Sequence, residues 1–185
     1  MVERLERAFL HDWTRAGGDT FIVSPVPAAG DLDCELVLHE GLRDTRTLDA
    51  LLELVHSAKR RLLFVNTFPL VLELQRALRR SLERGVEVTL LFGNVRPRWG
   101  DENVLFPGGA MRALGDNLVR ARLEPLLRAG ARGYELGMPS STLKTLWPHV
   151  HAKLFVRDED TVAVGSANVD VTSSYWESEV LLLVH

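Results

Sequence analysis

Hydrophobic positions along the chain alternate between the spacing of buried strands and that of amphipathic helices. Short apolar runs predict strands at residues 35–38, 61–65, 86–92 and 132–136. Apolar residues three or four positions apart predict helices at residues 48–55, 71–82 and 111–123. Gly85 is placed to end the second helix, and Pro125 to break the third and begin a short one that ends at Gly130. Because strands that alternate with helices pair in parallel, this part predicts a sheet covered by helices.

The last part of the chain has a different pattern. Short strand patterns follow one another at residues 151–156, 161–164 and 180–184, with no clear helix among them. This favours a hairpin added to the sheet. The predicted fold class is therefore α/β, a single domain with a mixed, largely parallel sheet flanked by helices. Residues 1–30 are interpreted as an N-terminal helix and linker, and residues 31–185 as the domain itself.

Composition narrows the class of protein. The chain has 185 residues, enough for one domain, and its 46% apolar content is enough for a buried core. The net charge of −3 disfavours a protein that binds nucleic acid through bulk positive charge. Cys34 is the single cysteine, which excludes an internal disulfide or a cysteine-rich zinc site and indicates a reducing, cytoplasmic setting. No stretch approaches the ~20 apolar residues of a spanning helix.

The residues that carry chemistry lie in the stretch HAKLFVRDEDTVAVGSAN. His151 and Lys153 are two positions apart, so on a strand they share a face. If residues 159–160 form a two-residue hairpin turn, Lys153 lies opposite Ser166 and His151 lies opposite Asn168. The positions expected to point into the core are then Ala152, Leu154 and Val156.

An imidazole, an ammonium group, a hydroxyl and a carboxamide on one face suit a phosphate group. The lysine supplies a compact positive charge for the non-bridging oxygens. The serine and the asparagine supply neutral hydrogen-bond donors to the same oxygens. The histidine can act as a nucleophile or a proton donor near neutral pH.

The spacing of these residues also resembles a family signature. The pattern H-x-K-x4-D-x6-G-S-x-N resembles that of the phospholipase D superfamily, and it is met by His151, Lys153, Asp158, Gly165, Ser166 and Asn168. Members often carry an Asp, a Ser and a Glu further on, which here would be Asp170, Ser173 and Glu179. The segment with Phe9, Asp12 and Trp13 resembles the F-x-x-D-W segment of bacterial cardiolipin synthase-like proteins, and the rest of the chain resembles their C-terminal half.

The resemblance implies a phospholipase D half-domain that acts on phospholipids as a phosphodiesterase or phosphatidyltransferase, without metal or cofactor. His151 would attack phosphorus and form a phosphohistidine, while Lys153 and Asn168, helped by Ser166, would hold the phosphoryl oxygens. Glu179 would accept a hydrogen bond from the other ring nitrogen of His151. The positions expected to organise the structure are Asp158, Gly165 and Asp170. Three places depart from the family pattern: Thr172 stands in place of an arginine, Glu177 in place of an asparagine, and residues 66–69 (NTFP) in place of a Thr-Pro-Tyr-like turn.

The resemblance also implies a partner. Such enzymes use two motifs, one histidine as nucleophile and one as general acid, and the sequence contains one motif. The second would come from a homodimer, or from a missing N-terminal half, as the F-x-x-D-W segment favours. Peripheral contact with the inner membrane face is one interpretation of the loop aromatics Trp99, Phe106 and Trp147. Two alternatives stay open: a homodimeric nuclease of the same superfamily, which the acidic balance disfavours, and an isolated non-catalytic half-domain.

Overall fold

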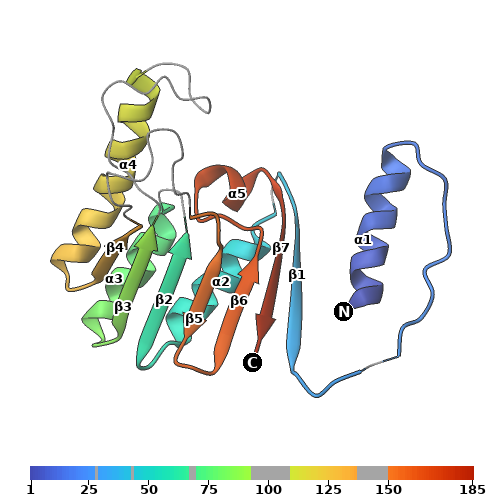
Figure 1. Cartoon of the computed structure of the whole chain (residues 1–185), viewed down its shortest axis with the longest axis horizontal. Helices are drawn as coiled ribbons and strands as arrows, with labels where there is room; N and C mark the ends of the chain where they lie inside the picture. Colours follow the sequence, from blue (N-terminus) through green and yellow to red (C-terminus); the bar gives the residue numbers. More distant parts are fainter. Residues whose placement is uncertain (28, 43, 67–69, 93–108, 137–149) are drawn as a thin grey trace, which may run out of the picture.

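The computed structural model describes residues 1–27, 29–42, 44–66, 70–92, 109–136 and 150–185, and only the backbone of residues 109–116. Within these residues seven strands form one sheet with the order β1-β7-β6-β5-β2-β3-β4 (Figure 1). The strands are β1 (Cys34–Glu40), β2 (Arg61–Asn66), β3 (Glu87–Phe92), β4 (Arg132–Glu135), β5 (Leu154–Arg157), β6 (Thr161–Gly165) and β7 (Ser178–Val184). Each coincides, within a few residues at its ends, with a strand that the apolar pattern predicted.

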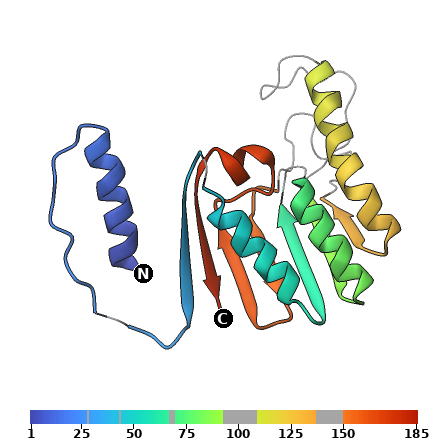
Figure 2. The ribbon, with the colours of Figure 1, turned by 180° about the vertical axis from the view of Figure 1, so that it is seen from behind.

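Three helices cover one face of the sheet. They are α2 (Arg46–Ser57), α3 (Leu72–Glu83) and α4 (Gly109–Arg128), which lie behind the sheet in Figure 1 and in front of it in Figure 2. The helix α1 (Val2–Arg15) stands beyond the edge strand β1, and the short α5 (Val171–Tyr175) joins β6 to β7. The prediction of a single α/β domain with a mixed sheet flanked by helices is confirmed.

The sheet is mixed, but the expectation that it is largely parallel is wrong. Four of its six strand pairs are antiparallel, and only β2–β3 and β3–β4 are parallel. The reason is the connections: long helical crossovers join β2, β3 and β4, whereas a tight turn joins β5 to β6 and the short α5 joins β6 to β7. β5 then enters beside β2 in the opposite direction.

Two helices differ from the pattern-based expectation. α4 continues through Pro125 as one helix to Arg128. A proline close to the end of a helix removes a single backbone hydrogen bond, and the packing of α4 against α3, with Leu126 in the hydrophobic core, maintains the helix. α5 was missed because five residues are too few for an apolar periodicity to be visible. By contrast, α3 ends before Gly85 as expected, and that glycine has a φ of +85°.

The register of the β5–β6 hairpin differs by one residue from the expected one. Asp158 and Glu159 have φ values of +52° and +83°, as a type I′ turn requires, and the N–H of Asp160 donates to the carbonyl of Arg157 at 3.1 Å. Because Arg157 pairs with Thr161, Lys153 lies opposite Gly165 rather than Ser166. A shift of one residue changes which side chains of β6 share a face with those of β5.

The core receives the other set of side chains from β5. Phe155 is fully buried and packs edge-to-face on Phe64, with ring centroids 4.8 Å apart. Leu154 and Val156, expected in the core, point to the opposite face and are half-buried. Ala152, also expected there, is exposed ahead of the strand. Lys153 lies on the face that carries Phe155, at the end of the sheet.

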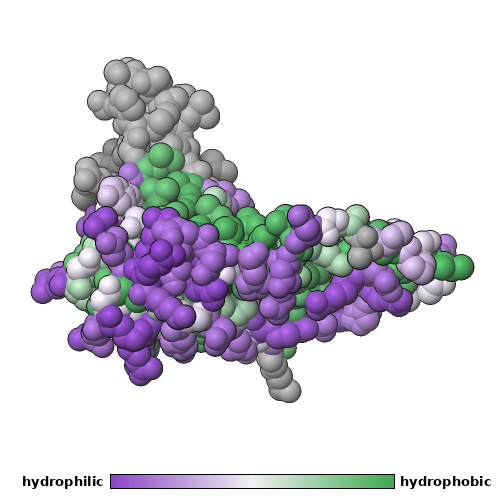
Figure 3. Space-filling model, turned by 90° about the horizontal axis from the view of Figure 1, so that it is seen from below, coloured by the Kyte–Doolittle hydropathy of each residue, from purple (hydrophilic) through white to green (hydrophobic). Residues whose placement is uncertain are grey.

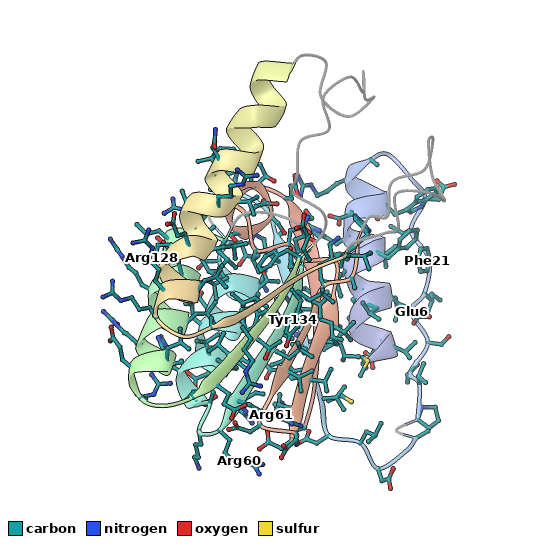
Figure 4. The ribbon with its side chains drawn as sticks, turned by 60° about the vertical axis from the view of Figure 1, so that its left-hand side comes forward. Glu6, Phe21, Arg60, Arg61, Arg128 and Tyr134 are labelled. Atoms are coloured by element: carbon teal, nitrogen blue, oxygen red, sulfur yellow. The ribbon has the colours of Figure 1, made fainter. Side chains whose placement is uncertain are left out.

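Asp158 ties this hairpin to the rest of the sheet. Its carboxylate accepts hydrogen bonds from the backbone N–H groups of Lys59, Arg60 and Arg61 at 2.7–2.8 Å, where β2 begins. Burial alone would raise the pKa of Asp158, but these three donors outweigh it and hold the pKa below its ordinary value. The side chains of Arg60 and Arg61 pair with Glu159 at the same end of the sheet (Figure 4).

We expect Asp158→Asn to lower the free energy of unfolding by about 2–3 kcal/mol, because an amide cannot accept three backbone hydrogen bonds as a carboxylate does. The folded-state pKa lies below 3.8. The carboxylate therefore stabilises the fold fully above the unfolded-state pKa, and this stabilisation is lost as the pH falls through the folded-state pKa. Urea unfolding between pH 7 and pH 3 measures both effects. The exposed Asp160 of the same turn is the control, and a loss at Asp160→Asn as large as that at Asp158→Asn would contradict the assignment.

Candidate active site

The motif residues meet at one edge of the sheet, where β2, β3 and β6 end and β5 and β7 begin (Figure 1). His151 and Lys153 precede β5, Ser166 and Asn168 follow β6, and Glu179 is the second residue of β7. The antiparallel pairing of β5, β6 and β7 brings these three segments together. The Arg60–Arg61 pair lies at the opposite edge and is not part of this site.

Lys153 is the buried cation of the site. Its side chain is 5% exposed, and its Nζ donates to the backbone carbonyl of His151 at 2.8 Å. Burial lowers the pKa of Lys153, and the carboxylates of Glu179 and Asp170 oppose this shift. An ammonium group has three N–H donors, so two remain for other acceptors.

Glu179 is the buried carboxylate of the site. One of its oxygens accepts a hydrogen bond from the hydroxyl of Ser166, and the other accepts one from the hydroxyl of Ser173. Ser166 in turn accepts from the N–H of Val180 at 3.0 Å. Glu179 thus connects the segment after β6, the helix α5 and the start of β7.

The segment from Asn168 to Ser173 is shaped by local capping contacts. The carboxylate of Asp170 accepts from the N–H of Ser173 at 2.9 Å and from the hydroxyl of Thr172 at 2.9 Å, which caps α5. The N–H of Asn168 donates to the hydroxyl of Ser173 at 2.7 Å. In the described structure the buried Oδ1 of Asn168 has no hydrogen-bond partner.

Gly165 is required by the close approach of two strands. A Cβ at this position would lie 2.0 Å from the carbonyl oxygen of Val180 and 3.0 Å from the Cα of Leu181. Both contacts are with backbone, which cannot move aside as a flexible side chain can. Glycine therefore allows Ser166 to donate its N–H to Val180 at 2.9 Å.

The structure brings most of the predicted site residues together, with one change of partners. Lys153, Ser166, Asn168 and Glu179 share the edge, as expected, although Ser166 contacts Glu179 instead of facing Lys153. His151 is exposed at the same edge, two residues before Lys153. The hydrogen bond from His151 to Glu179 stays a prediction.

His39 is a buried neighbour of the site that the sequence did not suggest. It is 2% exposed and lies opposite Glu179 in the β1–β7 pairing. Its Nδ1 lies 2.8 Å from the hydroxyl of Thr47 on α2, and its buried Nε2 has no hydrogen-bond partner among the described residues. Only the long-range pairing of β1 with β7 places it there, and no local motif signals such a pairing.

A metal cluster and a membrane-spanning helix are absent from the described residues, and the loop aromatics lie outside them. Within the described part of the chain no cluster of three or more His, Cys, Asp or Glu is arranged to hold a metal ion. None of its helices has the length and apolar content needed to cross a membrane. The aromatics proposed for membrane contact, Trp99, Phe106 and Trp147, lie outside the described residues.

The fold and the motif together define a phospholipase D-like domain. Residues 51–185 match the family model described as cardiolipin synthase, PLD-like domain, and the chain belongs to this family. No curated protein matches the chain.

Solved structures with similar folds are related to it at low sequence identity. The phospholipase D family member Nuc from Salmonella typhimurium is 16% identical, with a TM-score of 0.58 over 82% of this chain and 83% of its own. NucT from Helicobacter pylori is 17% identical, with a TM-score of 0.58 over 83% of this chain and 86% of its own. Phosphatidylserine synthase from Haemophilus influenzae is 17% identical, with a TM-score of 0.66 over 97% of this chain but 40% of its own. These similarities show the fold.

We expect Gly165→Ala to destabilise the domain by about 2 kcal/mol or more, because the added methyl group collides with the backbone of β7. Gly133→Ala in β4 is a matched control, since its Cβ would meet only the flexible end of the Leu127 side chain. Chemical denaturation of both variants measures the difference. Equal losses at the two glycines would show that the close approach at Gly165 is not the cause.

Proposed function

We propose that this chain is a metal-independent phosphodiesterase or phosphatidyltransferase that acts on phospholipids through a phosphohistidine at His151. The observation that carries the proposal is the complete motif on the β5–β6 hairpin. Its residues lie at the open end of this hairpin, where Lys153 is buried. Family membership supports a phosphodiester as the substrate class. The family description, which names cardiolipin synthase, favours phospholipids.

Lys153 and Asn168 are proposed to hold the non-bridging phosphoryl oxygens. Lys153 has two N–H groups beyond its contact with His151, and burial strengthens their attraction to an anion. The amide of Asn168 supplies a neutral donor. His151 precedes this pair on the chain and is accessible to a substrate from solvent.

The reaction proceeds in two displacements. A ring nitrogen of His151 attacks phosphorus, a P–N bond forms, and the P–O bond to the leaving alcohol breaks. The leaving oxygen takes a proton from the histidine of a second motif, which then accepts a proton from the incoming water or alcohol. That nucleophile displaces His151, forming a new P–O bond and releasing free His151. Since the chain contains one such motif, a homodimer or another half-domain provides the other.

The motif suggests that Ser166 helps to hold the phosphoryl oxygens, but its contacts favour a different role. A serine hydroxyl has one proton to donate, and Ser166 donates it to Glu179. We therefore infer that Ser166 and Glu179 are positioning residues: they fix the segment that presents Asn168 and supply the negative charge beside Lys153. A hydrogen bond from Ser166 to the phosphoryl group would require the contact with Glu179 to break.

We expect the purified chain to hydrolyse bis(p-nitrophenyl) phosphate in the presence of EDTA, and His151→Ala to abolish this activity. His56→Ala, an exposed histidine at the end of α2, is the matched control and should retain the wild-type rate. Release of p-nitrophenol measures the reaction. Wild-type activity that needs a divalent cation, or that survives in His151→Ala, would overturn the mechanism.

The substrate is tested separately with phosphatidylglycerol vesicles and with DNA. Formation of cardiolipin or release of glycerol, both absent in His151→Ala, would support the phospholipid assignment. Cleavage of DNA without reaction of the lipid would favour the nuclease alternative. Absence of any activity in a verified folded sample would favour the isolated half-domain.

We expect Glu179→Gln to lower the rate about 10–100-fold, as loss of a positioning carboxylate typically does. Glu177→Gln, two residues earlier and exposed, should leave the rate nearly unchanged. The comparison of kcat, KM and alkaline pH profile for both variants measures the effect. The alkaline limb should move to lower pH only in Glu179→Gln, because removal of this carboxylate lowers the pKa of Lys153 further.

A further inference from the structure

The sheet has a second apolar face that none of the helices α2, α3 and α4 covers (Figures 1 and 2). Two continuous rows of side chains cross five strands on this face. One row is Leu63–Val156–Val162–Val184–Cys34, and the other is Val65–Leu154–Val164–Leu182–Leu36. None of these ten residues belongs to the hydrophobic core cluster. We refer to the ten as the open face, and apolar surface is visible on the corresponding upper side of Figure 3.

Such a face requires a cover. An antiparallel sheet can expose one face to water, but that face is then largely polar, and a contiguous apolar surface marks an interaction site. Val164, in the middle of its row, is 43% exposed, and Leu36 and Val65 are buried. The half-buried members are Leu63, Leu154, Val156, Val162, Leu182, Val184 and Cys34.

The N-terminal arm, residues 1–33, has the complementary property. Its helix α1 carries Val2, Leu5, Phe9 and Trp13 at helical spacing, and no residue of α1 is buried. Of the 17 large apolar side chains that are exposed in the described part of the chain, nine lie in this arm. The opposite side of α1 is charged, with Glu3 and Arg7 paired at 2.6 Å.

The arm is held away from its own sheet. α1 stands beyond β1 in both ribbon views, and Phe21 of the linker packs beside Phe9, with ring centroids 6.2 Å apart (Figures 1, 2 and 4). The indole N–H of Trp13 donates to the carbonyl of Asp19 at 3.0 Å, which closes the end of the helix against the linker. The linker then contains Pro25 and Pro27, and such a Pro-x-Pro segment favours an extended chain over one that folds back.

We propose that α1 docks through its apolar stripe on the open face of a second copy of this chain, and that the exchange is reciprocal. The open face then gains the helical layer it lacks, and each stripe leaves water. Exchange of an identical element between protomers is a low-cost route to a dimer when the connecting segment is extended. A helix of 14 residues is about 21 Å long and five strands span about 19 Å, so one helix suffices for the face.

The exchange would also supply the partner that the proposed function needs, and this part of the inference rests on that function. The proposed chemistry needs a second motif, and a second copy contains one. The dimer itself follows from the two unpartnered apolar surfaces and stands whether or not the chain hydrolyses phosphodiesters.

Crosslinking between single-cysteine proteins tests the docking directly. In a Cys34→Ser background, one protein carries Leu5→Cys on the stripe and a differently tagged protein carries Val164→Cys on the open face. We expect a bismaleimide to link the two into a mixed dimer, which can only be intermolecular. Arg7→Cys on the charged side of α1 replaces Leu5→Cys in the control and should give at most a fifth of the product.

A chain with both Leu5→Cys and Val164→Cys distinguishes the alternatives. A product that migrates as an internally linked monomer would show that α1 covers its own sheet, and would overturn the exchange. A monomer in sedimentation without either crosslink would also overturn it. A dimer without the Leu5–Val164 link would show that another surface associates.

Substitution of the stripe gives a second readout that does not depend on cysteine chemistry. Phe9→Glu is expected to raise the dissociation constant of the dimer at least about 100-fold, because each dimer loses two buried aromatic contacts. Arg7→Glu should leave it within a few-fold. Because Phe9 is exposed in the described structure, the variant should keep its fold, which circular dichroism checks. An unchanged constant in Phe9→Glu would contradict the proposal.

Discussion

The arrangement of the site depends on the hydrogen bonds that one carboxylate accepts from three backbone N–H groups. Asp158 holds the turn of the β5–β6 hairpin against the first residues of β2, and it thereby fixes the position of β5 between β2 and β6. Every motif residue at the far edge takes its place from this hairpin or from β7 beside it. Asp158 contacts none of the proposed substrate-binding groups. It belongs to the motif because it fixes the register of β5, on which the position of Lys153 depends. The buried lysine reaches the site edge only if the strand that it begins is in the correct register.

The strands and most helices could be predicted from the chain because their apolar spacing is local. The hairpin register could not, because it depends on Asp158 and Glu159 adopting positive φ values, which acidic residues rarely do without outside support. That support comes from Lys59, Arg60 and Arg61, about a hundred residues earlier in the chain. The face assignment failed separately: the expectation that Lys153 turns away from the core put Leu154 and Val156 on the wrong face, which concealed the second apolar side of the sheet.

The site residues that belong to the motif could be predicted, because the motif sets their spacing along the chain. Lys153, Asn168 and Glu179 lie where the motif indicates, since two strands and a short connection bring them together. The partner of Ser166 was not predictable, because the contact with Glu179 depends on α5, which no periodicity reveals. The position of His39 beside the site could not be predicted from any local pattern. It reaches Glu179 through the pairing of the first and last strands of the sheet, and only the folded topology determines that pairing.

The charges beside Lys153 bear on the proposal that two motifs act together on a phosphodiester. The carboxylates of Glu179 and Asp170 oppose the effect of burial on the pKa of Lys153, so this cation has negative charge beside it. These carboxylates favour the charged form of the buried ammonium, but they would also repel an anionic substrate. A second motif brings a second lysine to the phosphoryl group, and it also supplies the proton for the leaving oxygen. Both considerations favour the proposal that two motifs act on one phosphorus. In the proposed assembly, the sheet face that α2, α3 and α4 leave open and the apolar stripe of α1 are suited to hold the copies together, because their burial adds no charge near the phosphate.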